Sequence, residues 1–497
     1  MRLFFAPFVT RAARPRHRAH DRHLNTEDSQ LRTQSSGLRR TTLLLALLCH
    51  GAAAQAEVLI RWDHARIPPP QVLGVTTLVV PSAAEETVRQ ARALGYRVYL
   101  EIEGSAIGNV PEPPAGVAGV IVTGTADAGR LRELARRLAA SGVRVLAADA
   151  RARWPHIRSS TVTRNGDVLQ VSARSAQPWI ETNAALAPLR RMEAAEPPTI
   201  LRVEPPPRAD GAELDEYLLA IAEAGSFRSP VVLSLAPALQ RDLAEGTGPA
   251  RADWASVRES LRFEAANSGT PVEPLVNVGI AASEPLFWFD VLNLLARHNV
   301  TFQLLDPASL QPEHLAPFDL LIVLDADRTR PGMLLDYARQ GRTLVVSQPR
   351  DEGARMPWRQ GAPAATPDER PVYEAGRGRV IELPAGPGNP DAFALWIRQL
   401  LGRDRRVLDV WNGITIVATP FVSPDSGELL VTLLNYAARS LPVQLRVRGT
   451  FASARFESPG AAPILLPCTS RNGFTELVIP ALRIGGHVIL RSGDANR

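Results

Sequence analysis

The clearest alternation of apolar and polar positions lies between Val272 and Pro349. An apolar strand, VEPLVNVGIA, is followed by FWFDVLNLLARHNV, whose apolar residues recur at helical spacing. The strand TFQLLDP, the buried strand DLLIVLDAD, the helix GMLLDYARQG and the strand TLVVSQP come next. Strands that alternate with helices in this way predict a parallel sheet covered on both faces, a doubly wound α/β domain.

A longer series of strands and helices precedes this block. Three segments, AEETVRQARALG, GRLRELARRLAASG and DGAELDEYLLAIAEAG, have helical periodicity and end in glycine, which fits a helix C-cap. Eight β/α repeats predict a TIM-like barrel, compact because the segment has only about 180 residues, and an open sheet is the alternative. The eight predicted strands are VLIRWD (58–63), VTTLVVP (75–81), YRVYLEIEG (96–104), GVAGVIVTG (116–124), VRVLAADA (143–150), DVLQVSA (167–173), TILRVEP (199–205) and PVVLSLA (230–236).

The pattern changes again after Arg406. Segments such as GELLVTLLNYA, LPVQLRVRG and FTELVIPAL alternate apolar and polar residues between turn signals, which predicts an antiparallel β-sandwich. The sequence is therefore divided into a leader and signal peptide (1–56), a compact TIM-like barrel (57–271), an α/β domain (272–405) and a β-sandwich (406–497).

Composition and charge narrow the classes of function. The hydrophobic content of 45% and charged content of 22% are typical of a globular protein. Much of the formal net charge of +5 comes from arginines in the first 40 residues. The remainder has no basic stripe with interleaved aromatic residues, so nucleic acid is not an expected partner.

The segment 38–56 resembles a secretory signal peptide. Arg39 and Arg40 precede a short apolar run, and Ala54-Gln55-Ala56 forms an A-x-A cleavage site. We therefore expect cleavage after Ala56, secretion or a periplasmic location, and no integral membrane span in the mature chain. Only Cys468 would remain after cleavage, which excludes a disulfide within the chain and a cysteine-based metal site.

The order of the parts resembles the family 42 glycoside hydrolases and related clan A enzymes. The resemblance rests on LVNVGIAASEPLFWFDVLNLLARHNVTFQLLD with FDLLIVLDAD, and on LLVTLLNYAARSLPVQLRVRG with LRIGGHVILRSG. It implies a barrel, a glutamine-amidotransferase-like α/β domain and a β-sandwich, with an oligo- or polysaccharide as partner. A working glutaminase is excluded, because residues 272–349 hold no cysteine nucleophile. The α/β domain is then a scaffold and a candidate contact in a homo-oligomer.

Glycoside hydrolysis needs two carboxyl groups beside a sugar-binding cleft, and a barrel carries such groups at the C-terminal ends of its strands. The resemblance to clan A implies an acid after the fourth strand and a nucleophile after the seventh. The seventh predicted strand ends at Glu204. The fourth ends at Val122-Thr123-Gly124 without a carboxylate, so Glu103 or Asp149 would supply the acid.

The alternation within the strands gives a second indication. Glu101 and Glu103 share one face of their strand, as do Arg61 and Asp63, and Arg202 and Glu204. If the apolar faces meet the outer helices, these polar faces point into the barrel. They would then form either a carbohydrate cleft or a set of bridges from Arg61 and Arg202 to Glu101 that fills the barrel.

Two further groups follow predicted strands. RARWPHIRSS places Arg151 and Trp154 in one loop, and QPWIETN places Trp179 and Glu181 in another. Tryptophan rings stack on sugars, and arginine and carboxylate groups form hydrogen bonds with them. The alternative for QPWIETN is a capped helix start with Trp179 in the core. The histidines lack the spacing of metal ligands, so we expect neither a metal nor a cofactor.

Two hypotheses follow. One is a secreted glycoside hydrolase that uses Glu204 with Glu103 or Asp149. The other is a catalytically inert carbohydrate- or envelope-binding scaffold of the same ancestry, because fold alone does not fix function.

Overall fold

A computed structural model describes residues 57–493 except 82–84, 110–112, 150, 159, 166–167, 174–178, 194–196, 207–213, 247–248, 348–355, 361, 365–369, 384–385, 412, 414 and 438. The predicted signal peptide lies outside the described residues. In the described part, no helix is both long and apolar enough to cross a membrane.

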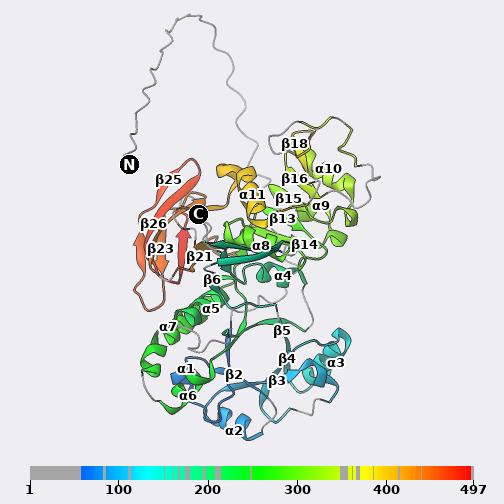
Figure 1. Cartoon of the computed structure of the whole chain (residues 1–497). Helices are drawn as coiled ribbons and strands as arrows, with labels where there is room; N and C mark the ends of the chain where they lie inside the picture. Colours follow the sequence, from blue (N-terminus) through cyan, green and yellow to red (C-terminus); the bar gives the residue numbers. More distant parts are fainter. Residues whose placement is uncertain are drawn as a thin grey trace, which may run out of the picture. The chain divides into compact units, whose positions relative to one another are not determined.

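Seven parallel strands close into a barrel in the order β1-β11-β10-β5-β4-β3-β2 (Figure 1). They are β1 (Val58–Arg61), β2 (Thr77–Pro81), β3 (Arg97–Glu103), β4 (Val117–Thr123), β5 (Arg144–Asp149), β10 (Thr199–Val203) and β11 (Val231–Ser234). The helices of this part are α1 (Pro70–Leu73), α2 (Glu85–Ala93), α3 (Ala128–Ala139), α4 (Leu186–Glu193), α5 (Leu214–Ser226), α6 (Pro237–Glu245) and α7 (Ala250–Ser268). The TIM-like barrel predicted from the sequence is confirmed.

The barrel has one strand fewer than predicted. The segment 167–173 forms β8 (Val168–Ala173), which pairs antiparallel with β7 (Ser160–Asn165) in a separate hairpin. A second short ladder joins β6 (His156–Arg158) to β9 (Trp179–Glu181). The Asn165-Gly166 pair is a strong hairpin signal, and alternation alone does not distinguish a hairpin strand from a barrel strand. Glu204 therefore follows the sixth barrel strand, so strand counting no longer supports its match to the seventh.

The α/β domain has a six-stranded sheet in the order β14-β13-β15-β16-β18-β17, in which only β17 is antiparallel to its neighbour. Its strands are β13 (Val278–Ala281), β14 (Phe302–Leu305), β15 (Leu320–Val323), β16 (Thr343–Ser347), β17 (Val372–Ala375) and β18 (Gly378–Leu383). Helices α8 (Phe289–Arg297) and α11 (Pro390–Arg405) share a core with one face, and α10 (Pro331–Arg339) with the other, while α9 (Pro312–Leu315) is a short connection. This is the predicted doubly wound arrangement.

Large apolar side chains are exposed at one turn of this domain. Leu286 and Phe287, between β13 and α8, expose 50% and 75% of their surface. The homo-oligomer contact expected through this domain stays a prediction, and so does its likeness to glutamine amidotransferases.

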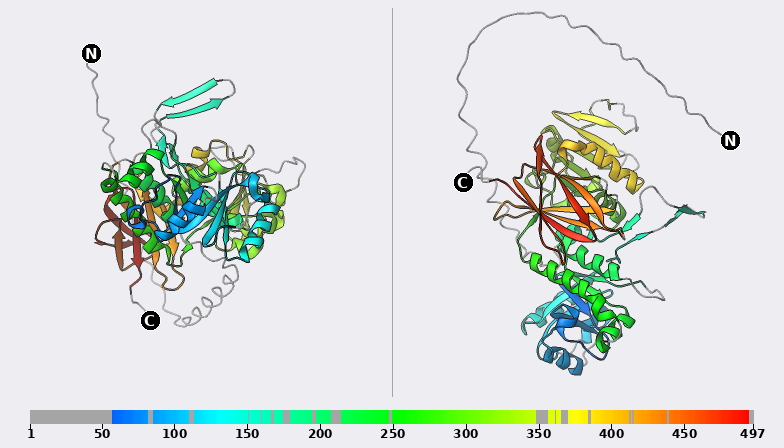
Figure 2. Two further views of the ribbon diagram at one scale, coloured as in Figure 1. Left: turned by 90° about the horizontal axis from the view of Figure 1, so that it is seen from below. Right: turned by 90° about the vertical axis from the view of Figure 1, so that its left-hand side faces the viewer.

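Two antiparallel sheets form the predicted β-sandwich (Figure 2). One contains β12 (Glu273–Pro274), β20 (Ile416–Val422), β21 (Leu429–Asn435), β27 (Gly485–Arg491), β23 (Ser453–Glu457) and β24 (Ile464–Leu466). The other contains β19 (Leu408–Trp411), β22 (Leu441–Arg448), β26 (Phe474–Leu482) and β25 (Thr469–Arg471). Alternate apolar residues, such as Val431 and Val488 from the first sheet and Val443 and Ile479 from the second, meet in one core.

Candidate active site

The barrel interior has an apolar layer to which every strand contributes one residue. The layer consists of Leu59, Val79, Tyr99, Ile121, Leu146, Ile200 and Val232. Side chains repeat their direction every second residue, so the positions two residues further on face the same interior, nearer the C-terminal mouth. Arg61, Glu101 and Arg202 occupy three of these positions. The polar residues at the C-terminal mouth of the barrel thus face the interior because side-chain direction repeats every second residue along each strand.

Glu101 is the centre of this polar level. Its Oε2 lies 2.6 Å from Arg61 Nε, and its Oε1 lies 3.1 Å from Arg202 Nη1. The side chain of Glu101 is 12% exposed. One carboxylate from β3 therefore joins guanidinium groups from β1 and β10, and these are the Arg–Glu bridges foreseen as the alternative to a cleft.

Two more carboxylates lie at the outer ends of this chain of ion pairs. Arg61 Nη1 is 2.8 Å from Asp63 Oδ2, and Arg202 Nη2 is 2.5 Å from Glu204 Oε1. The Asp63 and Glu204 side chains are 40% and 54% exposed, whereas the arginines are mostly covered. The mouth therefore presents carboxylates to solvent, with guanidinium groups beneath them.

Glu103 reaches the turn that follows β4. Gly124 has a φ of +72°, and a Cβ placed there would come within 2.6 Å of Glu103 Oε2. The carboxyl group of Glu103 thus lies at the end of the fourth strand, where the sequence itself has no acid. Glu103 is exposed and forms no ion pair with any residue that the structure describes.

Asp149 lies apart from these carboxylates. Leu146 and Ala148 pack at the interior layer, so Asp149 has the opposite parity and faces the helices. It is buried, and Arg151 contacts its two oxygens at 2.7 Å each while also bonding to Glu193 of α4. The oxygens of Asp149, which the sequence offered as an alternative catalytic acid, are turned away from the mouth and occupied by Arg151, a geometry that does not favour this role.

The loop residues predicted to bind sugar are mostly inside the fold. Trp154 is buried and packs edge-to-face on Tyr217 with 5.3 Å between the ring centres. Glu181 is buried and lies 2.7 Å from a guanidinium nitrogen of Arg153. The burial and contacts of Trp154 and Glu181 favour a structural role over the predicted contact with sugar. Trp179 belongs to β9, and its side chain lies outside the described residues.

Two buried polar atoms at the mouth have no hydrogen-bond partner among the described residues. They are the hydroxyl oxygen of Ser234, at the end of β11, and Nε of Arg202. Ser234 has the same parity as the interior residue Val232. Buried polar atoms without partners commonly mark a site for water or ligand. The signal in the sequence that identifies Ser234 as an interior residue is the alternation in VVLS, which places it on the same face as Val232.

A second polar network was not anticipated from the sequence. Tyr436 donates to Glu223 Oε1 at 2.5 Å, and the side-chain amide of Asn183 donates to Oε2 at 2.7 Å. Burial raises the pKa of Glu223 to about 7, and the hydrogen bonds from Tyr436, Asn183 and Thr182 oppose this rise. The network joins α5 to the end of β21, so its geometry is that of a contact between the barrel and the sandwich.

The described residues include no group of three or more histidine, cysteine or acidic side chains that could hold a metal ion. The mouth offers carboxyl groups in two environments. Glu204 is held by an arginine, and Glu103 stands at the fourth strand without such a partner in the described structure.

No protein-family model matches the sequence, and no curated protein matches it significantly. The structure is similar to that of "Alpha-L-fucosidase isoenzyme 2" from Paenibacillus thiaminolyticus, with a TM-score of 0.59, 11% identity, and coverage of 88% of this chain and 100% of that one. It also matches a rhamnosidase from Novosphingobium sp. PP1Y, with a TM-score of 0.44, 12% identity, and coverage of 74% of this chain and 38% of that one.

The first of these two solved structures, the one with the higher TM-score, is described as an alpha-L-fucosidase. The particular likeness to family 42 stays a prediction. At 11% identity, the match to the fucosidase establishes the fold, a TIM-like barrel with associated β-domains, and leaves the reaction to be argued from the residues at the mouth of the barrel.

Proposed function

We propose that this chain is a secreted glycoside hydrolase whose substrate binds at the C-terminal mouth of the barrel. Glu204 is the nucleophile or general base, and Glu103 is the general acid. The observation that carries the proposal is the difference between these two exposed carboxyl groups. Glu204 is in an ion pair with Arg202, while Glu103 lies at the fourth strand without an ion-pair partner among the described residues.

The two roles need opposite protonation states. A nucleophile or base must be ionised, and a nearby guanidinium group favours the ionised form of a carboxyl group. The acid must carry a proton that it can give to the leaving oxygen. In the structure Arg202 holds Glu204 in place, whereas Glu103 has no ion-pair partner among the described residues.

Ser234 and Arg202 add a means of holding the sugar. A sugar hydroxyl group can accept a hydrogen bond from Nε of Arg202 and exchange another with the hydroxyl of Ser234, because neither atom has a partner among the described residues. Asp63, exposed at the end of β1, offers a further acceptor at the same mouth. Glu101 serves to position the two arginines rather than to touch the substrate.

Hydrolysis of a panel of aryl glycosides tests the proposal, with fucosides and rhamnosides included because of the similar structures. Glu204→Gln and Glu103→Gln should each lower kcat by about 10²–10⁴-fold. Glu133→Gln, which changes an exposed carboxyl group on α3, should leave kcat unchanged. If the enzyme is active and both mouth variants retain full activity, the assignment of these residues is wrong.

A non-catalytic carbohydrate-binding scaffold is the second candidate. It is favoured by the extent of Arg–carboxylate pairing at Glu101 and Glu204, which can be purely structural. Glycan binding without turnover across the panel, together with unchanged binding by Glu204→Gln, would support this candidate over the enzyme.

Secretion belongs to the same proposal. If the predicted signal peptide is used, the mature chain recovered from the periplasm or the medium should begin at Glu57, directly after Ala56. Intact-protein mass spectrometry measures this directly. A chain that retains residues 1–56 would contradict the proposed route without affecting the proposed chemistry.

A further inference from the structure

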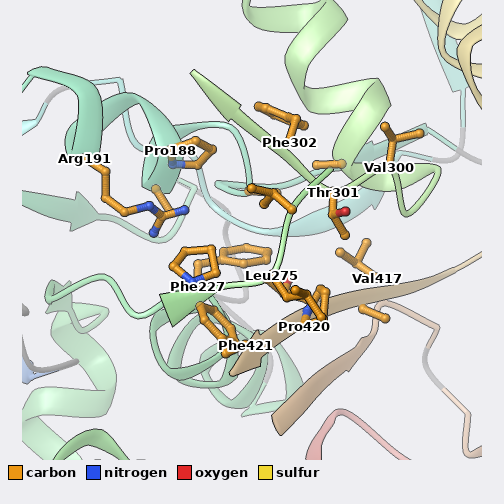
Figure 3. A pocket seen from close by; sticks show the side chains of 17 residues that line it. Pro188, Arg191, Phe227, Leu275, Val300, Thr301, Phe302, Val417, Pro420 and Phe421 are labelled. Carbon is orange, nitrogen blue, oxygen red and sulfur yellow. The ribbon is translucent and has the colours of Figure 1, made fainter. Parts of the chain in front are cut away.

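A small pocket, lined by none of the residues of the proposed active site, lies where three parts of the fold meet (Figure 3). Helix α4 and Phe227 line it from the barrel part, the turn between α8 and β14 from the α/β domain, and β20 from the sandwich. Pockets at such junctions are frequent sites for small molecules.

The residues that line this pocket are mostly apolar, and only one of them is charged. Fourteen of its 17 residues are alanine, valine, leucine, proline or phenylalanine, two are threonine, and the last is Arg191. None of these 17 described residues carries a carboxylate. In Figure 3 the guanidinium group of Arg191 is directed toward the space beside Pro188 and Phe227, with Thr301 on the far side.

Arg191 also lacks a counter-charge elsewhere in the described structure. It forms no ion pair or hydrogen bond with any described residue, unlike its neighbour Arg190, whose Nε donates to Thr199. Arg191 is exposed to solvent at the edge of the pocket. A planar guanidinium group beside an apolar cavity matches a ligand with a carboxylate at one end and a hydrocarbon group at the other.

The size of the cavity limits that hydrocarbon group. Its volume is about 50 Å³. A water-sized group occupies about 10–15 Å³ on this measure, so the cavity accepts about three to five such groups. A hydrocarbon chain of three carbons fits inside, with the carboxylate at Arg191.

We propose that this pocket binds a short-chain aliphatic monocarboxylate of about four carbons, the size set by the cavity volume. The carboxylate accepts two hydrogen bonds from Arg191, and the chain lies against Phe227 and Phe421. The site is independent of the proposed glycosidase chemistry.

Isothermal titration of the full-length protein with butyrate tests the proposal. Binding should be saturable with a Kd of about 1 mM, in keeping with the few atoms in contact. Butyramide, which has the same shape without the charge, should bind at least about tenfold more weakly, the factor expected for losing a charge-assisted hydrogen bond.

Substitutions test separately the contributions of the guanidinium group and of the cavity to binding. Arg191→Gln should weaken butyrate binding at least about tenfold, whereas Arg89→Gln, on an exposed face of α2, should not change it. Ala187→Leu should abolish binding by filling the cavity while Arg191 remains, with an unchanged circular dichroism spectrum as the check on folding. Absence of saturable binding, equal affinity for butyramide, or undiminished binding by Arg191→Gln would each overturn the proposal.

Discussion

Glu264 of α7 and His487 of β27 face each other in the contact between the barrel and the sandwich. Both are buried, with Oε2 of Glu264 3.6 Å from Nε2 of His487. Burial raises the pKa of Glu264 from 4.5 to about 8, against a smaller opposing effect of Arg228. Burial likewise lowers the pKa of His487 from 6.5 to about 3, helped by Arg228. Both groups are therefore neutral in the folded protein near pH 6.

These two groups make opposite contributions to the pH dependence of stability. Folded Glu264 keeps a proton that the unfolded chain releases, so the free energy of unfolding falls as the pH rises from 4.5 to about 8. At about 1.4 kcal/mol per pH unit the full loss is about 5 kcal/mol. Between pH 6.5 and about 3, His487 stays unprotonated in the folded protein but binds a proton in the unfolded chain. The free energy of unfolding therefore falls as the pH drops through this range. Between pH 4.5 and 6.5 the two dependences cancel.

The Glu264→Gln substitution removes the pH dependence that comes from Glu264. The variant has no carboxyl group to ionise, so its stability relative to the wild type should increase by about 1.4 kcal/mol per pH unit between pH 4.5 and about 8. Urea unfolding followed by tryptophan fluorescence at half-unit pH steps measures this difference, and taking the difference removes the contribution of Glu223.

Glu259→Gln is the matched control, because Glu259 is an exposed carboxyl group on the same helix. Its difference from the wild type should not depend on pH. A difference curve for Glu264→Gln that is equally flat would refute the reasoning, since it would mean that Glu264 ionises in the folded protein much as it does in the unfolded chain.

Three further changes test other contacts by the same unfolding measurement. Glu101→Gln should destabilise the protein by about 2–3 kcal/mol, because it leaves two partly buried arginines without their shared carboxylate, and an unchanged midpoint would contradict this. Tyr436→Phe should cost about 1–2 kcal/mol by removing the donor to Glu223, and its loss should be absent in a Glu223→Leu background. Gly225→Ala should cost about 1–3 kcal/mol, because the new methyl group would stand 1.7 Å from Glu264 Oε2, and a neutral effect would show that α5 and α7 can separate.

The features predicted best from the sequence are those that depend on the local repeat of apolar and polar residues along one strand or helix. Alternation along single strands placed Arg61, Glu101 and Arg202 on inward faces, and their contacts in the structure follow from that parity. The doubly wound sheet and the sandwich were predictable for the same reason, since each strand or helix signals its own type locally. The same parity on β5, where Leu146 and Ala148 face the interior, indicates that Asp149 faces outward.

Features that depend on pairs of distant segments could not be predicted in this way. The hairpin of β7 and β8 has the alternation of a barrel strand, and only its pairing partner reveals the difference. Glu103 reaches Gly124 because β3 and β4 are neighbours in a particular register. Glu223 and Glu264 are buried only because α5 and α7 pack against the sandwich, which lies some 200 residues further along the chain.

The pairing at the mouth of the barrel bears on function as well as stability. A carboxylate at Glu101 that bridges two arginines fixes the position of Arg202, and Arg202 in turn holds Glu204. If Glu204 is catalytic, Glu101→Gln should therefore lower kcat while Glu204 itself is intact, because the freed guanidinium group can withdraw both oxygens of Glu204 from the substrate. If the network is only structural, the same variant should lower stability and leave glycan binding unchanged. Measuring both the loss of kcat and the loss of stability in Glu101→Gln distinguishes the two cases. A loss of kcat indicates an active site that the ion-pair network supports, whereas a loss of stability alone indicates a network that only fills the barrel.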